Sequence, residues 1–393
     1  MSTLLLLLPI IPVAGALGGL GYYSLCLWSA LRFTRSLEQV EKSGLADRPP
    51  FTPPVTILKP LRGTDPEMMV SFRSHCLQDY PEYEIIFGVS DATDPAVAVV
   101  TQLQEEFPDR AIRVVVCEKI LGTNIKVSNL IQMLPYASHE HLLVNDSDIR
   151  VDRDYLRRVF APFAEAKVGM VTTLYRGIAG ATLPSMLESL GISTDFSGGV
   201  LAARLLEGGL RFGLGSTLAL TKTGLAKIGG LEDIVDFLAD DYQLGRRLHD
   251  AGYDVMLSDV VVDTFLPSYT WREFIGHQLR WARNVRDARK WGYLGVLFTF
   301  GLPWAMLAVL SHWGSPWMPV IWVLLGTVGL IRLLMAVTVG VGILRDGQVL
   351  RSLWLVPLRD VIAMALWFAS FAGNTIVWRG VRFRLKDGRL AKV

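Results

Sequence analysis

The sequence is short of charged residues and of cysteine. Only 19% of its 393 residues are charged and the formal net charge is +2, whereas nucleic-acid-binding proteins usually carry a strong basic excess. Nucleic acid is therefore not an expected partner. The three cysteines, Cys26, Cys76 and Cys117, are odd in number and widely spaced. That spacing argues against a disulfide framework or a cysteine metal site and is typical of buried thiols in a reducing compartment.

Two nucleotide-binding motifs are also missing. Neither a G-x-x-x-x-G-K-[ST] loop nor a G-x-G-x-x-G fingerprint occurs between a predicted strand and helix, so a P-loop or a Rossmann dinucleotide site is not supported. What the sequence has instead is apolar residues. They make up 51% of the chain, and the mean hydropathy is +0.35. This composition argues against a wholly soluble enzyme and indicates a membrane protein with a substantial polar part.

The first long apolar run lies at the N-terminus. Residues 4–31 contain no charge and exceed the roughly 20 residues that a membrane-spanning helix needs. A cleaved signal peptide is the alternative, but the run lacks a basic beginning and continues far beyond a cleavage site. We therefore predict a transmembrane anchor over residues 1–35. Arg32 and Arg35 follow the run, which by the positive-inside rule places the next segment in the cytoplasm.

Apolar character returns after a middle region of ordinary composition. The middle covers residues 53–290, and the later apolar blocks are about 294–311, 317–343 and 353–378. We predict transmembrane or re-entrant segments over 294–378, followed by a basic tail over 379–393. Three full crossings would put that tail outside, against the positive-inside rule. Either one block is re-entrant or the rule fails.

The middle region alternates short apolar runs with longer amphipathic stretches. Strands are predicted at 55–58, 84–89, 112–116 and 142–144, with helices at 66–78 and 94–106. Such alternation favours βαβ units and a parallel sheet with helices on both faces. Ligands of such sheets bind beyond the carboxyl ends of the strands.

Acidic residues fall at those strand ends. Asp91 follows the second predicted strand, and Asp146 and Asp148 follow the fourth. Aspartate is also common in turns and at helix N-caps, which is the structural alternative. Two carboxylates one residue apart nevertheless repel each other unless a cation intervenes, and hard oxygen ligands suit Mg²⁺ or Mn²⁺.

A second acidic pair and a basic aromatic motif lie further along the chain. Asp240 and Asp241 open a predicted helix over 242–251, where they could simply complement the helix dipole. His277, Arg280 and Trp281 share one face of a later predicted helix. That helix, rich in Trp and Arg, also suits the headgroup layer of a membrane.

Taken in this order, these residues resemble an inverting glycosyltransferase of the family-2 type with a GT-A fold, and more narrowly the ceramide glucosyltransferase branch (family 21). That branch has spaced aspartates, matched here by Asp91, Asp146 and Asp241, and a closing Q/R-x-x-R-W motif. One departure is His277, which stands where the motif has Gln or Arg. The sequences 191–196 and 277–281 are also similar to bacterial hopanoid-biosynthesis glycosyltransferases, so the acceptor stays open between ceramide and a hopanoid polyol.

The resemblance implies an α/β GT-A (Rossmann-like) cytosolic domain held by N- and C-terminal transmembrane helices in the inner membrane of the cell. It implies transfer of glucose or N-acetylglucosamine from a UDP-sugar to the hydroxyl of a membrane lipid at the cytoplasmic face of the bilayer. The resemblance implies that Asp241 is the catalytic base, with Asp240 beside it, and that Asp146 and Asp148 are ligands of Mg²⁺ or Mn²⁺. It implies that His277 and Arg280 face the diphosphate and that Trp281 covers it. Asp91 would contact the uridine or ribose, and Lys59 and Lys126 would line the donor site.

Three other functions are weighed against this one. A processive polysaccharide synthase would share the aspartates but needs more transmembrane helices to form a tunnel. A transporter needs charges at a central membrane site, for which Arg332 and Arg359–Asp360 are the only candidates. A non-catalytic membrane scaffold would not turn over labelled UDP-sugars. We further expect the apolar stretch 183–210, including Leu187, to meet the membrane; its alternative is core beneath the sheet.

Overall fold

The computed structural model describes residues 9–42 and 51–392, so the first eight residues of the predicted anchor lie outside the described residues. An eight-stranded sheet has the order β3-β2-β1-β4-β7-β6-β8-β5. Its strands are β1 Val55–Leu61, β2 Tyr83–Val89, β3 Ile112–Val116, β4 His141–Val144, β5 Ile149–Arg150, β6 Val168–Ile178, β7 Leu218–Thr221 and β8 Asp254–Phe265.

Helices cover both faces of the sheet, as predicted. Successive side chains of a strand point to opposite faces: Ile57 of β1 packs in the cluster that contains Phe72 and Leu103, whereas Leu58 packs with Leu130. The helices of this part of the chain are α3 Met68–Cys76, α4 Ala96–Glu106, α5 Ile125–Met133, α6 Tyr155–Phe160, α7 Leu183–Gly191, α8 Ser197–Leu206, α9 Lys222–Lys227, α10 Asp240–Asp250 and α11 Trp271–Ala288.

The prediction of a parallel sheet is correct for only part of it. β1 pairs in parallel with β2 and β4, β2 with β3, and β6 with β8. β7 runs antiparallel to both β4 and β6, and β5 is antiparallel to β8. The sheet is therefore mixed, because β7 reverses direction where the two parallel groups meet.

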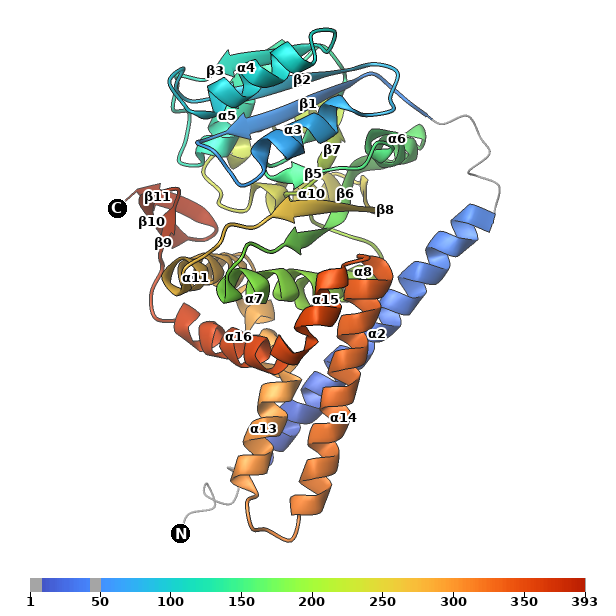
Figure 1. Cartoon of the computed structure of the whole chain (residues 1–393), viewed down its shortest axis with the longest axis vertical. Helices are drawn as coiled ribbons and strands as arrows, with labels where there is room; N and C mark the ends of the chain where they lie inside the picture. The colour runs from blue at the N-terminus through green and yellow to red at the C-terminus, as the bar shows by residue number, and fades with distance from the viewer. Residues whose placement is uncertain (1–8, 43–50, 393) are drawn as a thin grey trace.

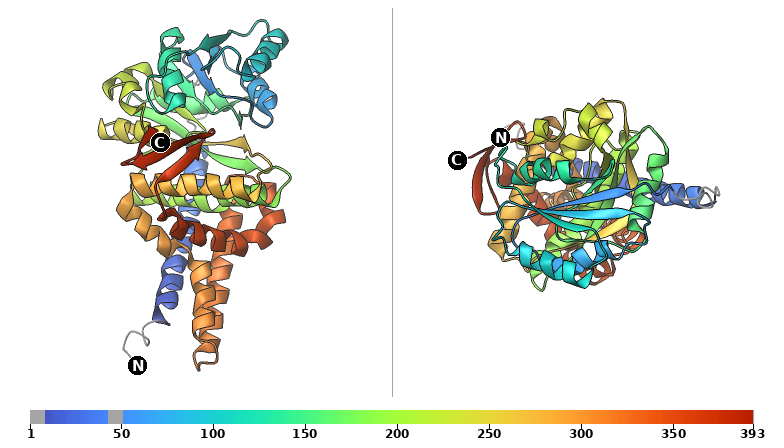
Figure 2. Two further views of the ribbon diagram at one scale, coloured as in Figure 1. Left: turned by 90° about the vertical axis from the view of Figure 1, so that its left-hand side faces the viewer. Right: turned by 90° about the horizontal axis from the view of Figure 1, so that it is seen from above.

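Three long helices project away from the sheet on one side (Figures 1 and 2). They are α2 Ile10–Lys42, α13 Gly301–Ser311 and α14 Met318–Ala336. α2 packs against both α13 and α14, which form a hairpin. Among the described residues, three helical segments are long and apolar enough to cross a membrane, namely 10–39, 318–343 and 347–370; a bent pair, 290–299 with 301–311, makes a fourth if it counts as one span.

The contact between α2 and α13 depends on glycine. A Cβ added at Gly19 would overlap the backbone of Gly301, whereas a Cβ added at Gly21 would meet nothing within 4 Å. We expect Gly19→Ala to push the two helices apart. Like other overpacking substitutions, it should lower the free energy of unfolding of the detergent-solubilised protein by about 1–3 kcal/mol. Gly21→Ala is the matched control and should leave the midpoint of thermal unfolding unchanged or slightly raised. Equal midpoints for the two variants would contradict this packing.

The last predicted membrane block does not run alongside the others. Helix α16 Val356–Ser370 lies across the direction of α13 and α14, beneath α7 and α11 (Figure 1). Asp360 of α16 accepts two hydrogen bonds from Arg332 of α14, both at 2.9 Å, and both side chains are buried. A short helix, α15 Gly347–Ser352, leads into α16. The chain therefore returns to the side of the sheet after the hairpin and stays there.

The end of that block and the basic tail form a second sheet. Its strands are β9 Thr375–Trp378, β10 Val381–Lys386 and β11 Arg389–Lys392. The tail packs on the loop before α10: the Leu238 N–H donates to the carbonyl of Gly388 at 3.0 Å and the Leu390 N–H to that of Asp236 at 2.8 Å. The expectation that the apolar block continues to 378 is wrong, because the helix ends at Ser370. The tail therefore lies beside the main sheet.

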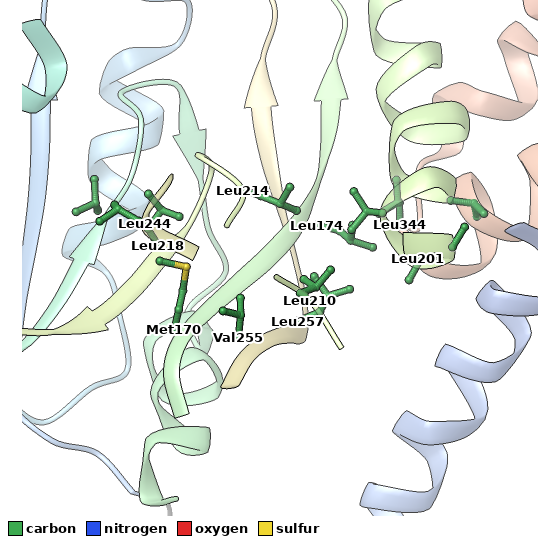
Figure 3. Packing of buried hydrophobic residues seen from close by; sticks show 14 of the residues in the cluster. Met170, Leu174, Leu201, Leu210, Leu214, Leu218, Leu244, Val255, Leu257 and Leu344 are labelled. Atoms are coloured by element: carbon green, nitrogen blue, oxygen red, sulfur yellow. The ribbon is translucent and has the colours of Figure 1, made fainter. Parts of the chain in front are cut away.

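The core is continuous from the sheet to the long helices. Figure 3 shows Met170 and Leu174 of β6 in one cluster with Leu201 of α8 and with Leu344, which follows α14. Leu187 of α7 is fully buried in the same cluster. The expectation that Leu187 meets the membrane is therefore wrong, and the alternative, core beneath the sheet, is correct at this position.

Candidate active site

A cavity of about 1270 Å³ lies where the carboxyl ends of β1 and β4 face α7, α11 and the small C-terminal sheet. Its walls come from segments far apart in the sequence. They include Asp146 and Asp148 after β4, Asp240 and Asp241 at the start of α10, and His277, Arg280 and Trp281 of α11. With Lys126 at the start of α5, the structure thus brings eight of the ten predicted site residues into one cavity.

The loop that carries Asp146 and Asp148 is held from below. The buried amide of Asn145 donates to the Tyr155 hydroxyl at 2.9 Å and to the Ser216 carbonyl at 2.7 Å. The Lys59 ammonium donates to the Asp146 carbonyl at 3.0 Å. Burial lowers the pKa of Lys59 to about 7, against the opposing pull of the Asp148 and Asp146 carboxylates.

Two predicted donor-site residues lie elsewhere. Lys59 is fully buried under the loop and, among the described residues, is not part of the cavity wall, because its side chain points from the middle of β1 into the layer beneath. Asp91 is exposed and accepts hydrogen bonds from the backbone and hydroxyl of Thr93, both at 2.8 Å, which lower its pKa. This is the turn geometry that was the alternative for Asp91.

Asp148 has two other carboxylates near it. Burial and the charges of Asp146 and Asp65 raise its pKa to about 6, although the Thr264 hydroxyl donates to it at 2.6 Å. Among residues 9–42 and 51–392, no three metal-binding side chains converge. Two carboxylates at a cavity wall nevertheless fit Mg²⁺ or Mn²⁺, which commonly take one or two protein carboxylates together with substrate phosphates and water. A divalent cation would also relieve the repulsion that raises the pKa of Asp148.

Lys126 joins the two acidic pairs. Its ammonium lies 2.9 Å from Asp146 and 3.2 Å from Asp240. Burial alone would lower the pKa of Lys126, but these two carboxylates outweigh burial and raise it. Lys126 is placed by the capped start of α5, where the Asn124 side chain accepts from the Val127 N–H at 3.2 Å.

Asp241 is set apart from this ion-pair network. It accepts hydrogen bonds from the backbone N–H groups of Gly215 at 2.9 Å and Tyr242 at 2.7 Å. Burial and the charge of Asp240 raise its pKa to about 6, with Lys126 acting in the opposite direction. A Cβ at Gly215 would lie 3.4 Å from carboxylate oxygens of both Asp146 and Asp241. The two carboxylates therefore flank Gly215, and Asp241 is a stronger base than an ordinary aspartate.

Helix α11 supplies the basic aromatic wall. A capping box at Thr270 and Glu273 starts the helix, so that His277, Arg280 and Trp281 share the face toward the cavity. The His277 ring lies 5.1 Å from that of Trp281. Burial lowers the pKa of Arg280, and among the described residues no carboxylate lies within 4.0 Å of its guanidinium. Arg280 is thus a partly buried cation in the cavity wall, available to an anionic ligand.

Four further cavity residues escaped sequence analysis. The guanidinium of Arg379, after β9, pairs with Asp65 at 3.0 and 3.1 Å, and both residues line the cavity beside Asp148. Tyr175 of β6 and Glu188 of α7 line its interior. A polar residue inside an apolar segment was the available signal for Glu188. Arg379 belongs to the predicted basic tail, whereas Asp65 and Tyr175 carry no local pattern.

Comparison with known proteins places this arrangement in a family. The model of glycosyl transferase family 21 matches residues 11–391. The chain belongs to this family. The match confirms the resemblance to ceramide glucosyltransferases that the aspartates and the closing motif indicated.

Individual family-21 relatives are distant. Ceramide glucosyltransferase 3 of Caenorhabditis elegans is 25% identical over 232 residues, which cover 59% of this chain and 50% of that protein. Ceramide glucosyltransferase of Komagataella phaffii is 31% identical over 130 residues, 32% of this chain and 26% of that protein. The chain spans about half the length of the first curated relatives it matches.

A solved structure confirms the fold. The mannosyltransferase PcManGT from Pyrobaculum calidifontis, in complex with GDP-Man and Mn²⁺, superposes with a TM-score of 0.53 at 19% sequence identity and covers 93% of this chain and 98% of its own. The predicted α/β fold of the GT-A type is therefore correct. Along the chain, helices apolar enough to span a membrane come both before and after the strands of the main sheet.

Proposed function

We propose that this family-21 chain transfers glucose or N-acetylglucosamine from a UDP-sugar to the hydroxyl of a membrane lipid, with inversion at the anomeric carbon. The observation that carries the proposal is a cavity in which Asp241 lies across Gly215 from Asp146, with the partly buried cation Arg280 in its wall. The names of its ceramide glucosyltransferase relatives support ceramide as acceptor; a hopanoid polyol rests on the sequence resemblance alone.

In the proposed mechanism the aspartates after β4 hold the donor. Asp146 and Asp148 would hold Mg²⁺ or Mn²⁺, which would offset charge on the diphosphate. Arg280, with His277, faces the same diphosphate as it leaves, and Trp281 covers it. A partly buried guanidinium stabilises the negative charge that develops there. Lys126 keeps Asp146 and Asp240 in place. We retain Asp91 as a contact to the uridine or ribose, reached from its exposed turn.

Asp241 is the proposed base. As the acceptor oxygen bonds to the anomeric carbon and the bond from that carbon to the diphosphate breaks, the hydroxyl proton passes to the Asp241 carboxylate. Attack from the face opposite the leaving group inverts the configuration, by the displacement logic of inverting glycoside hydrolases. Asp240, buried next to Asp241, keeps the basicity of that carboxylate high.

The membrane arrangement follows from the helices. We propose that α2, α13 and α14 cross the inner membrane and that α16 lies at its surface, with the catalytic domain in the cytoplasm. Arg32 and Arg35 at one end of the first span, and the basic strands β10 and β11 beside the main sheet, agree with the positive-inside rule in this orientation. Three crossings are also too few for the tunnel of a processive synthase.

The pH dependence tests the base. Because Asp241 accepts a proton only when ionised, kcat/KM should fall about tenfold per pH unit below the Asp241 pKa, which lies at about 6. Above pH 7, where Asp241 is ionised, log kcat/KM should not change with pH. A flat profile down to pH 5 would assign proton acceptance to a group with an ordinary carboxylate pKa.

Metal removal and product analysis test the reaction itself. Protein purified in detergent and incubated with labelled UDP-glucose or UDP-N-acetylglucosamine should convert ceramide or a hopanoid polyol into a glycolipid detectable by mass spectrometry. EDTA should stop conversion, and Mg²⁺ or Mn²⁺ should restore it. Asp148→Ala should raise the required metal concentration at least tenfold, while Asp259→Ala, at a surface ion pair with Arg158, should not. Full activity in EDTA would show that Asp146 and Asp148 form only a turn.

A further inference from the structure

Glu188 is a buried carboxylate whose charge nothing in the proposed mechanism uses. Its residue is 1% exposed, and it lies among the residues that line the cavity. Within the described part of the chain neither carboxylate oxygen has a hydrogen-bond partner. Burying a carboxylate without such partners is costly, so a side chain in this state is prepared for a ligand that supplies the missing hydrogens.

The helix fixes Glu188 in this position. Its neighbours Leu187 and Leu190 are buried in the core that joins the sheet to the long helices, and the Ser189 hydroxyl donates to the Gly177 carbonyl at 2.6 Å. α7 therefore cannot rotate to expose Glu188 without losing this packing. The carboxylate stays aimed at the cavity.

The groups around Glu188 come from three elements. The Nδ1 atom of His277 on α11 lies 2.8 Å from Oε1 of Glu188, although the angles do not form a hydrogen bond. The Tyr269 ring stacks on His277 with centroids 5.7 Å apart. Tyr175 of β6 lines the same cavity, and burial, followed by the charges of Asp241 and Glu188, raises its pKa. The charge of Glu188 also raises the pKa of Arg280, against the larger effect of burial.

Beyond Glu188 the cavity wall becomes apolar. Ile192 and Phe196, in the π-helix Ile192–Phe196 that continues α7, line it together with Trp281, whose ring lies 6.2 Å from Phe196. The π-helix packs against α14 and against the π-helix Val337–Ile343 that continues α14. These two segments together form one of the helices apolar enough to cross a membrane. Glu188 thus stands where the polar end of the cavity meets an apolar wall that leads to the membrane helices.

We propose that Glu188 binds a hydrogen-bond donor on the head group of the lipid acceptor, next to the hydroxyl that reacts. The inference rests on the proposed function and adds the second point at which the acceptor is held. Asp241 takes the proton of the reacting hydroxyl, and Glu188 accepts a hydrogen bond from the neighbouring group of the same acceptor. That group is an amide N–H or second hydroxyl in ceramide and a second hydroxyl in a polyol.

A different role would leave a different signature. If Glu188 only held His277 and Arg280 in place for the diphosphate, its loss would weaken the donor and spare the choice of acceptor. The two roles are separated by measuring KM for the UDP-sugar and kcat/KM for each acceptor in the same variant.

The test uses the full chain in detergent with three acceptors of matched chain length: a short-chain ceramide, a lipid diol, and a lipid with a single hydroxyl. Glu188→Gln keeps the shape of the side chain and removes its charge. We expect kcat/KM for the ceramide and the diol to fall about 10- to 100-fold, the value of a hydrogen bond to a charged group. The single-hydroxyl lipid and KM for the UDP-sugar should change less than about twofold on the same scale. Glu188→Asp should recover part of the loss, and Glu165→Gln, at an exposed site, should match the wild type.

The two acceptor classes show which source supplies the donor group. A loss confined to ceramide assigns the contact to the amide, and an equal loss with the diol assigns it to the second hydroxyl. Unchanged acceptor preference in Glu188→Gln, or a raised KM for the UDP-sugar with preference retained, overturns this inference and leaves the proposed function standing. A wild type that binds the UDP-sugar but glycosylates none of the lipids overturns the proposed function and this inference together.

Discussion

Asp241→Asn is expected to lower kcat by about 10²- to 10⁴-fold, the range measured for loss of a general base. Asparagine has the same shape and its amide oxygen can still accept from the Gly215 N–H, which now donates to Asp241 at 2.9 Å. It cannot take up the proton of the acceptor hydroxyl. Because a base acts only in the transition state, the loss should appear in kcat while the dissociation constant of the UDP-sugar stays nearly unchanged.

Two variants on the same helix complete this experiment. Asp250→Asn removes a carboxylate at the exposed end of α10, where Asp250 pairs with Arg246 at 3.0 Å, and should keep wild-type kcat. Asp240→Asn removes the partner of Lys126 and should weaken donor binding as well as turnover. Unimpaired turnover in Asp241→Asn would refute its assignment as base, and an equal loss in Asp250→Asn would point to damage to the helix.

Asp360→Ala is expected to lower the free energy of unfolding by about 3–5 kcal/mol, the cost of removing one partner of a buried ion pair. The variant leaves the Arg332 guanidinium, 1% exposed at its side chain, with the Thr194 hydroxyl at 3.3 Å as its remaining hydrogen-bond partner among described residues. The midpoint of thermal unfolding in detergent measures the effect.

An apolar replacement of the whole pair separates charge from packing. Arg332→Met combined with Asp360→Leu removes both charges and fills their volume, so it should recover most of the lost stability, because such replacements of buried pairs are often neutral or stabilising. Asp254→Ala, which breaks an exposed pair with Lys167 at 3.2 Å, should cost less than about 1 kcal/mol. If the double variant is no more stable than Asp360→Ala, the packing of α16 rather than the stranded charge explains the loss.

How far the sequence predicts the fold depends on how each strand is buried. β1, β2 and β4 are buried on both faces, so they read as continuous apolar runs such as Val55–Leu58 and were predicted within a few residues. β6 and β8 were missed because polar side chains interrupt them. Asp263 of β8, for example, is buried and pairs with Arg176 of β6 and Arg150 of β5. A strand stabilised by such pairs lacks the apolar alternation by which strands are found.

The site was predictable where its residues are close in the sequence. Each acidic pair, Asp146 with Asp148 and Asp240 with Asp241, is close together in the sequence and can be recognised there without a structure. Lys59 was assigned to the donor site from the family resemblance, yet its strand is buried on both faces and the Lys59 side chain is fully buried. Tyr175 and Glu188 come to line the same cavity only after β6 and α7 have packed. Their function as ligands of the substrate is a prediction.

The small C-terminal sheet has a consequence for biosynthesis. Trp378 and Arg379 complete the cavity wall, and Arg379 reaches back to Asp65 near the start of the main sheet. The ribosome makes these residues after α13 and α14, so the main sheet, which comes first along the chain and folds as it emerges, has an unfinished wall until the hairpin has been synthesised. A nascent chain that ends at α14 therefore lacks Trp378 and Arg379 in its cavity wall. The cavity is complete only when the last strands of the chain have been made, so the site forms after both the N-terminal helix and the helical hairpin have been synthesised.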